Sequence, residues 1–145
     1  MRNTSFSMLD GSAVNPSMGA QSTAEEYLHF LQMLLQQGKY NGQEILSEAS
    51  VNELRTIYAQ AEKITEPPKN AVGFSYAPGA WVTEEKDGKA TALVSPSFYG
   101  SWPMIDWCRG YAFIILVKTI QGEQKKDMYM QMKDALDEKF GTSCK

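Results

Sequence analysis

The run GYAFIILV, residues 110–117, carries the strongest structural signal in the chain. Its apolar part, residues 112–117, is unbroken and rich in β-branched and aromatic side chains, which is typical of a strand covered on both faces. We therefore expect residues 110–118 to form the central strand of a sheet. A turn at residues 108–110 connects it to another candidate strand at residues 101–107.

Two further extended segments precede these strands. Residues 72–84 are expected to be extended, with an interruption near Pro78-Gly79. Asp87-Gly88 is a typical two-residue hairpin turn, and it leads into a strand over residues 90–94. These segments predict an antiparallel sheet built from hairpins.

Helical periodicity appears on both sides of the strands. Thr23 and Glu26 have the spacing of a capping box, which predicts a helix that starts there and runs to about Gln37. Ser47 has the character of an N-cap for a second helix. A last helix is expected from Gly122 to Phe140, and its apolar face is predicted to contain Tyr129, Met132, Leu136 and Phe140.

The predicted fold class is α+β, an antiparallel sheet with packing helices. The chain of 145 residues has the size of one domain, so we expect a single domain over residues 1–145. Its expected parts are an irregular opening segment at 1–21, a helical part at 22–66, antiparallel strands at 72–118 and a C-terminal helix at 122–141.

Composition excludes several functional classes. The net charge of -3 has the wrong sign for a phosphate-binding face, so no nucleic-acid partner is expected. One histidine, His29, and two cysteines, Cys108 and Cys144, do not supply the four ligands of a structural zinc site. We expect no metal, no other cofactor and two reduced thiols. The charged run at residues 84–87 is interpreted as solvated surface.

Nothing in the sequence predicts a membrane association. The first residues have no apolar run like that of a secretory signal, and no stretch approaches the roughly 20 apolar residues of a membrane span. As written, the chain is expected to stay in the cytoplasm, whereas full-length relatives can be exported proteins.

Several segments together resemble the C-terminal portion of the serine beta-lactamase and penicillin-binding-protein-like hydrolases, a superfamily that includes esterases. Residues 1–6 are similar to the family's Leu-Gly-Met-x-x-Thr-x-Phe element, and residues 15–35 to its Gly-Gly-x-x-Ser-Thr-Ala-x-Asp-Tyr helix. Residues 45–51 resemble the next helix. Residues 100–106, followed by 109–112, resemble the family's Gly-x-x-Pro-Trp-Ile-Asp hairpin. The resemblance extends over nearly the whole chain in family order, and it implies a partial beta-lactamase-like fold.

The catalytic elements of that family are missing. Its members use a serine with a lysine three residues later, so that the amine takes the hydroxyl proton, and no serine here has that spacing. Tyr40-Asn41 does not match the second element, Tyr-x-Asn. Ser50-Val51-Asn52 matches Ser-x-Asn by chance, within a predicted helix. The resemblance therefore implies a truncated hydrolase that lacks the N-terminal strands and the nucleophile helix, with no catalytic residue in this chain.

The family's third element, Lys-Thr-Gly or His-x-Gly, corresponds by position to Ser95-Pro96-Ser97. Serine in place of the cation removes the group that would orient a substrate carboxylate. The resemblance implies that the Phe98 amide would be an oxyanion donor, lying unpaired at a strand edge, and that the segment lines a cleft. The implied cleft-lining residues are Ser95, Pro96, Ser97, Phe98, Tyr99 and Trp102; the aromatic members are equally consistent with core or edge packing.

Three functions remain open at this point. The first is a catalytically inactive C-terminal half of a beta-lactamase-like serine hydrolase. The second is a stand-alone module that binds a protein or peptide along an exposed sheet edge, and the third is a subunit that complements a separate N-terminal half. In the family the strand at 110–118 is flanked by strands that this chain does not contain. We therefore expect a homo-oligomer or an N-terminal partner half to pair with strand 110–118, and proline at Ile115 to remove an edge amide.

Overall fold

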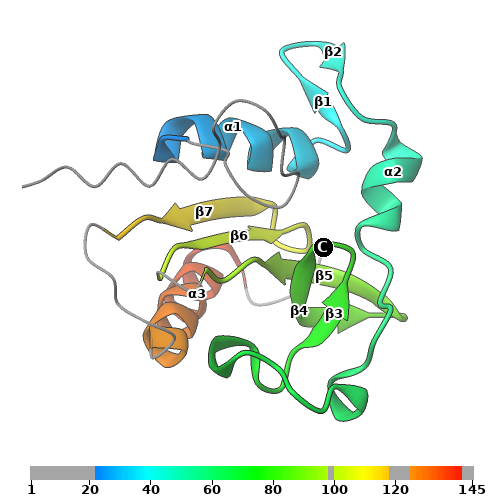
Figure 1. The fold of residues 1–145 in the computed structure, drawn as a ribbon. Coiled ribbons are helices and arrows are strands. Elements are labelled where there is room, and N and C mark those ends of the chain that lie inside the picture. Colours follow the sequence, from blue (N-terminus) through cyan, green and yellow to red (C-terminus); the bar gives the residue numbers. More distant parts are fainter. Residues whose placement is uncertain (1–21, 98–99, 118–124, 142–145) are drawn as a thin grey trace, which may run out of the picture.

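A five-stranded antiparallel sheet forms the centre of the computed structural model, which describes residues 22–97, 100–117 and 125–141. The strand order is β3-β4-β5-β6-β7, so each strand pairs with the next one along the chain. Figure 1 shows this arrangement. The strands are β3 (Ser75–Ala77), β4 (Ala80–Lys86), β5 (Lys89–Val94), β6 (Trp102–Asp106) and β7 (Tyr111–Ile115). This architecture confirms the α+β class.

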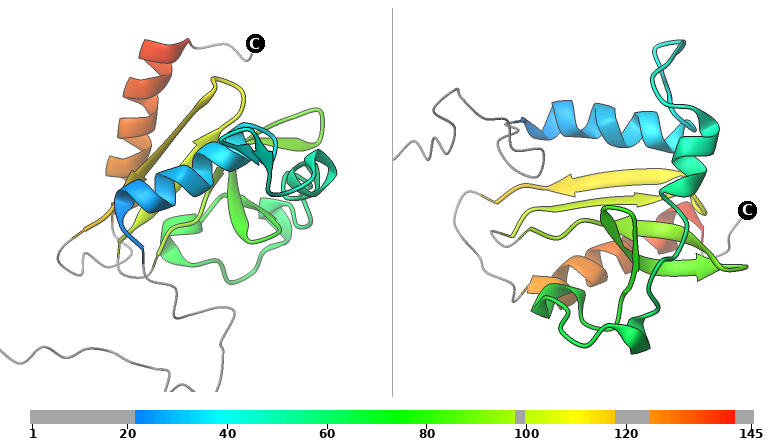
Figure 2. Two further views of the ribbon diagram at one scale, coloured as in Figure 1. Left: turned by 90° about the horizontal axis from the view of Figure 1, so that it is seen from above. Right: turned by 45° about the vertical axis from the view of Figure 1, so that its right-hand side comes forward.

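One long helix covers each face of the sheet. Helix α1 (Ala24–Leu35) lies on one face, across β6 and β7, and α3 (Lys126–Phe140) lies on the other (Figures 1 and 2). Among the described helices, none combines the length and apolar character needed to cross a membrane.

Short elements connect α1 to the sheet. They are a two-stranded hairpin of β1 (Lys39–Tyr40) and β2 (Gln43–Glu44), helix α2 (Glu48–Glu53), and the 3-10 turns η1 (Ala61–Lys63) and η2 (Lys69–Ala71). The part expected to be helical at 22–66 therefore also contains a small hairpin, and its second helix is short.

The start of α1 is the predicted capping box. The Thr23 hydroxyl accepts a hydrogen bond from the Glu26 amide at 3.2 Å, and the Glu26 carboxylate accepts one from the Thr23 amide at 2.9 Å. The helix ends at Leu35, close to the expected end, and Gly38 follows with φ +90°. A Cβ at Gly38 would lie 2.0 Å from the carbonyl oxygen of Leu46, so only glycine allows this close approach.

The core has two apolar clusters, one on each face of the sheet. The cluster under α1 includes Met33, Leu34, Val51, Val82, Leu93 and Ile105. The cluster under α3 includes Phe74, Ala92, Val94, Trp102, Met104 and Tyr129. In β6, Trp102 and Met104 belong to the α3 cluster and Ile105 belongs to the α1 cluster, as the two-residue period of a strand requires.

Strand β4 departs from this alternation. Val82 packs with the α1 cluster, whereas Glu84, two residues later, contacts Lys133 of α3. The register between β4 and β5 shifts by one residue between Val82 and Glu84 and shifts back between Glu84 and Glu85. An irregularity of this kind can change the face to which a single side chain points. This shift turns Glu84 toward α3.

Two predictions about the outer elements are wrong. Strand β7 lies at the end of the sheet order, so it is not the central strand that its apolar run predicts; it is an edge strand, as the family resemblance implies for a chain without the flanking strands. In α3, Tyr129 is buried as expected, but Met132 is 45% and Phe140 47% exposed, while Lys133 faces the sheet with no exposed surface. The expected opening segment at 1–21, the last residue of the expected strand at 110–118 and the first residues of the expected helix, 122–124, lie outside the described residues.

Candidate functional site

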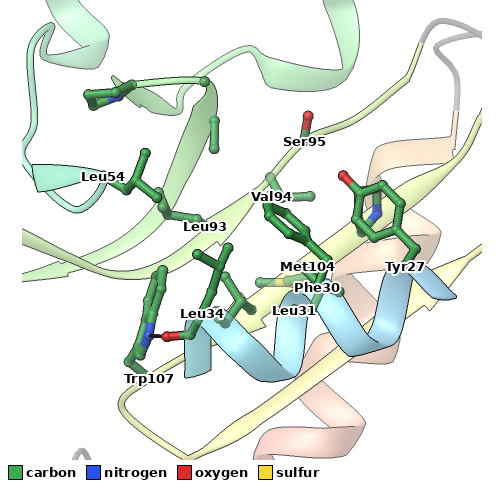
Figure 3. A pocket seen from close by; sticks show the side chains of 15 residues that line it. Tyr27, Phe30, Leu31, Leu34, Leu54, Leu93, Val94, Ser95, Met104 and Trp107 are labelled. Atoms are coloured by element: carbon green, nitrogen blue, oxygen red, sulfur yellow. Dashed lines mark hydrogen bonds between the residues drawn. The ribbon is translucent and has the colours of Figure 1, made fainter. Parts of the chain in front are cut away.

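An apolar pocket of about 290 Å³ lies beside α1, on the face of the sheet that this helix covers only in part. Because α1 packs mainly against β7, parts of β5 and β6 beside it are left as the pocket floor. Figure 3 shows the lining side chains. Those from α1 are Tyr27, Phe30, Leu31 and Leu34; the others include Leu54, Ala80, Leu93, Ser95, Ile105 and Trp107.

Two hydroxyl groups lie toward one end of this pocket, those of Tyr27 and Ser95 (Figure 3). Ser95 directly follows β5, and its amide donates to the Pro103 carbonyl oxygen at 3.1 Å, which extends the β5–β6 pairing by one residue. Burial raises the pKa of the Tyr27 phenol, so this group stays protonated at neutral pH. At the other end, the Trp107 indole donates to the Leu34 carbonyl oxygen at 3.0 Å.

The pocket can bind an apolar group but has no base to activate a hydroxyl. No lysine, histidine or carboxylate is present among the described residues that line it. Nucleophilic use of a serine requires an adjacent base within hydrogen-bonding reach. The arrangement therefore supplies shape and apolar surface, with hydroxyl groups at its rim.

The predicted cleft residues have different positions. Ser95 lines the pocket, and Pro96 and Ser97 are half-buried in the connection that follows it. The Ser97 amide donates to the Ser101 carbonyl oxygen at 2.9 Å, which holds this connection as a continuation of the hairpin.

Trp102 lies on the opposite face of the sheet from Ser95. It is 1% exposed, and its ring centroid is 5.1 Å from that of Tyr129 on α3. It therefore packs in the core and does not line the pocket. Phe98 and Tyr99, including the Phe98 amide, lie outside the described residues.

A cluster of charged side chains lies under α3. The Lys133 ammonium donates to the Asp137 carboxylate at 2.5 Å and to Glu84, and it is 3.4 Å from an oxygen of Asp106. The Arg109 guanidinium is 2.7 Å from both Glu84 and Asp106. We call these five residues the charge cluster.

Contacts within the charge cluster favour the charged forms of Glu84 and Lys133. Burial by itself raises the pKa of Glu84, but hydrogen bonds from Arg109 and Lys133 outweigh it and hold this pKa below its ordinary value. Burial likewise lowers the pKa of Lys133, and its bonds to Asp137 and Glu84 raise it by more. Burial and the bond to Asp137 raise the pKa of the Tyr111 phenol, which donates to that carboxylate at 2.6 Å.

The charge cluster is not an open metal site. Oxygens of Glu84, Asp106 and Asp137 lie within 4.8 Å of one another, as in some carboxylate metal sites. Here, however, Lys133 and Arg109 contact the same three carboxylates and offset most of their charge. The cluster therefore links α3 to the sheet through ion pairs.

Sequence reasoning missed this cluster for two reasons. Glu84 belongs to a mixed-charge run, and only the register shift in β4 turns it inward. Lys133 is a lysine on a helix, a residue type that is almost never fully buried. The one available signal was the spacing of Lys133 and Asp137, four residues apart on one helix face.

The expectation of two reduced thiols is wrong. Cys108 is disulfide-bonded, and the described residues contain no free cysteine. The chain has one other cysteine, Cys144, which lies outside the described residues.

Comparisons with known proteins identify a similar fold but no protein family. No protein-family model matches the chain, and no curated protein matches it. A solved structure titled "putative beta-lactamase from Bacteroides dorei" is similar to it, with a TM-score of 0.54 and 18% identity. The likeness covers 78% of this chain and 39% of that chain, so this chain spans well under half of that protein. The described fold is thus beta-lactamase-like.

Proposed function

We propose that this chain supplies the C-terminal half of a beta-lactamase-like serine hydrolase, and that it forms one side of the substrate cleft without the nucleophile. The observation that carries the proposal is the pocket beside Ser95. It lies where β5 ends, at the position that the family resemblance assigns to the cleft-lining strand. The beta-lactamase-like fold over 78% of the chain supports the same assignment.

The chain's share of the chemistry is recognition. Acyl transfer needs a nucleophile, a base and preorganised oxyanion donors. The sequence contains no Ser-x-x-Lys, and the pocket lining has no base among its described residues. In this account the pocket holds the apolar part of an acyl group, and a separate N-terminal half provides the serine and lysine.

Binding of an acyl group can be tested directly by methyl NMR. We expect butyramide, an uncharged short-chain acyl compound, to shift the methyl signals of Leu31, Leu93 and Ile105 saturably. Ile115 packs with the cluster on the other face, so its signals should not move. Absence of a saturable shift at the pocket methyls would overturn the cleft assignment.

A rim substitution provides the matched control. Ser95→Trp places an indole at an exposed position of the pocket opening, so it should abolish the methyl shifts while leaving the fold intact. Gln43→Trp, at an exposed position of the β1–β2 hairpin, should leave the shifts unchanged. Equal shifts in the Ser95→Trp variant would place the compound elsewhere.

The edge of β7 favours a second candidate, a module that binds another chain by strand addition. Strand β7 pairs with β6 and has no other strand partner within the described ranges, whereas the opposite edge strand, β3, is bridged to Ala59. Open edge amides and carbonyls are templates for a further strand. The same edge would receive a strand of the N-terminal half in the first candidate.

The pairing with β6 identifies which edge groups are free. Pro103 has no amide hydrogen, and its carbonyl oxygen accepts from Ser95, so its backbone faces β5. In an antiparallel ladder the residue opposite such a position directs its own backbone outward. That residue is Ile114, and Ala112 is equivalent to it. Ile115 lies opposite Trp102 in the paired register, so the expectation that it offers the edge amide is wrong.

A further inference from the structure

Arg55 differs from the buried cations Arg109 and Lys133 because it has no carboxylate partner among the described residues. Its Nε donates to the Ala90 carbonyl oxygen at 2.9 Å, and its guanidinium carbon lies 5.1 Å from the centroid of the Trp107 ring. Arg109 and Lys133 each contact three carboxylates. Within the part of the chain that the structure describes, no carboxylate lies within ion-pair distance of Arg55.

Burial without a counter-charge is unfavourable for this group. Desolvation lowers the pKa of Arg55, the opposite of the effect at Arg109, where carboxylates raise it. A guanidinium stays charged in proteins, so its desolvation lowers the stability of the fold unless an anion compensates the charge. Arg55 therefore has the electrostatic character of a binding residue, although its bond to Ala90 also fixes the chain after α2.

A polar cavity of about 430 Å³ opens next to Arg55. It lies at the end of the sheet where the β4–β5 and β6–β7 turns meet the C-terminal end of α1, and Trp107 separates it from the pocket beside Ser95. Its polar lining comes from Arg55, Gln37, Lys86, Asp87 and Thr91.

Two features of the lining indicate what a ligand would carry. The Gln37 side-chain oxygen is buried and has no hydrogen-bond partner, so it would accept a hydrogen bond from a hydroxyl or amine of the ligand and not from its anionic oxygens. An orphaned buried polar group is costly, so a ligand that satisfies it gains affinity. Lys86 and Asp87 offset one another, which leaves the single charge of Arg55 uncompensated in the described lining.

We propose that this cavity binds a small ligand through an oxyanion group, a carboxylate or a phosphate, with Arg55 as the main anchor. Among the described residues only the Nε of Arg55 makes a hydrogen bond, to Ala90, so its Nη groups can donate to a ligand, and a planar guanidinium matches either oxyanion. Lys86, an exposed residue of the lining, provides a second donor. This site is separate from the pocket beside Ser95, and ligand binding there does not depend on any hydrolytic activity.

Ligand binding in this cavity can be followed through the NMR signal of the Trp107 indole, which lines it. Titration with sodium phosphate, and separately with sodium acetate, is followed by ¹⁵N NMR at constant ionic strength set with chloride. We expect a saturable shift of the Trp107 indole signal with at least one of the two anions, which also identifies the oxyanion. The Trp102 signal should stay still, because that ring is buried on the opposite face.

Variants separate the site from general charge effects. Arg55→Gln should weaken binding at least tenfold, and Arg55→Lys should weaken it less. Lys63→Gln removes an exposed positive charge outside the cavity and should have no effect. If Arg55→Gln does not fold, Lys86→Glu tests the same site with the Arg55 contacts intact and should also weaken binding. No saturable Trp107 shift with either anion up to tens of millimolar, or shifts equal in all variants, would overturn the proposal.

Discussion

Lys133 has no exposed surface and contacts Glu84, Asp106 and Asp137, so its charge is essential to the packing of α3. We predict that Lys133→Met destabilises the protein by about 3–5 kcal/mol, because it leaves buried carboxylates with too little positive charge. Lys139→Met, at an exposed site on the same helix, should cost under about 1 kcal/mol. Urea unfolding measures both, and equal effects would contradict a buried ionic role.

The same cluster predicts an acid-sensitive stability. The folded-state pKa of Glu84 lies below its ordinary value, so its contribution is present above the unfolded pKa of about 4.3 and is lost as pH falls through the folded pKa. Urea midpoints measured downward from neutral pH should fall in this acidic range. In Glu84→Gln, which has no carboxyl to titrate, this fall should be shallower; an identical pH profile would exclude Glu84 as the cause.

The disulfide at Cys108 predicts that the purified protein contains no free thiol. Because Cys108 is disulfide-bonded and the chain has one other cysteine, alkylation of the unfolded, unreduced protein should add no mass. After reduction, two alkyl groups should be added. Non-reducing gels identify whether the bond lies within one chain. Two thiols reacting without reductant, in protein purified under air, would contradict the disulfide.

At the scale of elements, the exposed edge of β7 makes the chain prone to pair with another strand. In the isolated protein the available strand is β7 of a second copy, so we predict a concentration-dependent dimer in sedimentation equilibrium. Ile114→Pro removes an outward amide and should weaken the dimer, while Ile115→Pro should instead destabilise the fold, because Ile115 lies in the paired register. A monomer at all concentrations, with wild-type and Ile114→Pro identical, would refute this prediction.

Local signals explain which elements the sequence predicts well. The capping box at Thr23 and Glu26 and the hairpin turn at Asp87-Gly88 depend on neighbouring residues alone, and both form as expected. Asp87 and Gly88 have φ +54° and +77°, the two positive values that this turn type requires.

Elements whose orientation depends on tertiary contacts were less predictable. The face that α3 turns toward the sheet depends on the charge cluster, whose other members come from β4, β6 and the turn after β6, far away in sequence. The register shift before Glu84 leaves no mark on the apolar pattern. The apolar run in β7 indicated a strand correctly but did not reveal its place at the sheet edge.

At the scale of the whole molecule, the two faces of the sheet have different roles. The α3 face is filled by an apolar cluster and closed by the charge cluster. The α1 face keeps a pocket beside Ser95. The sequence resemblance pointed to Ser95 by order along the chain, but only the fold separates it from Trp102 and brings Tyr27 to the same pocket.

The most direct test of the proposed half-hydrolase is covalent acylation. The purified chain and its Ser95→Ala variant are incubated with a chromogenic beta-lactam and with a 4-nitrophenyl ester, while product release is followed and the intact mass is measured. We predict equal background rates and no acyl adduct, because the pocket lining contains no base and the sequence no Ser-x-x-Lys. Turnover above that background, together with an acyl adduct on a serine of this chain, would contradict the account.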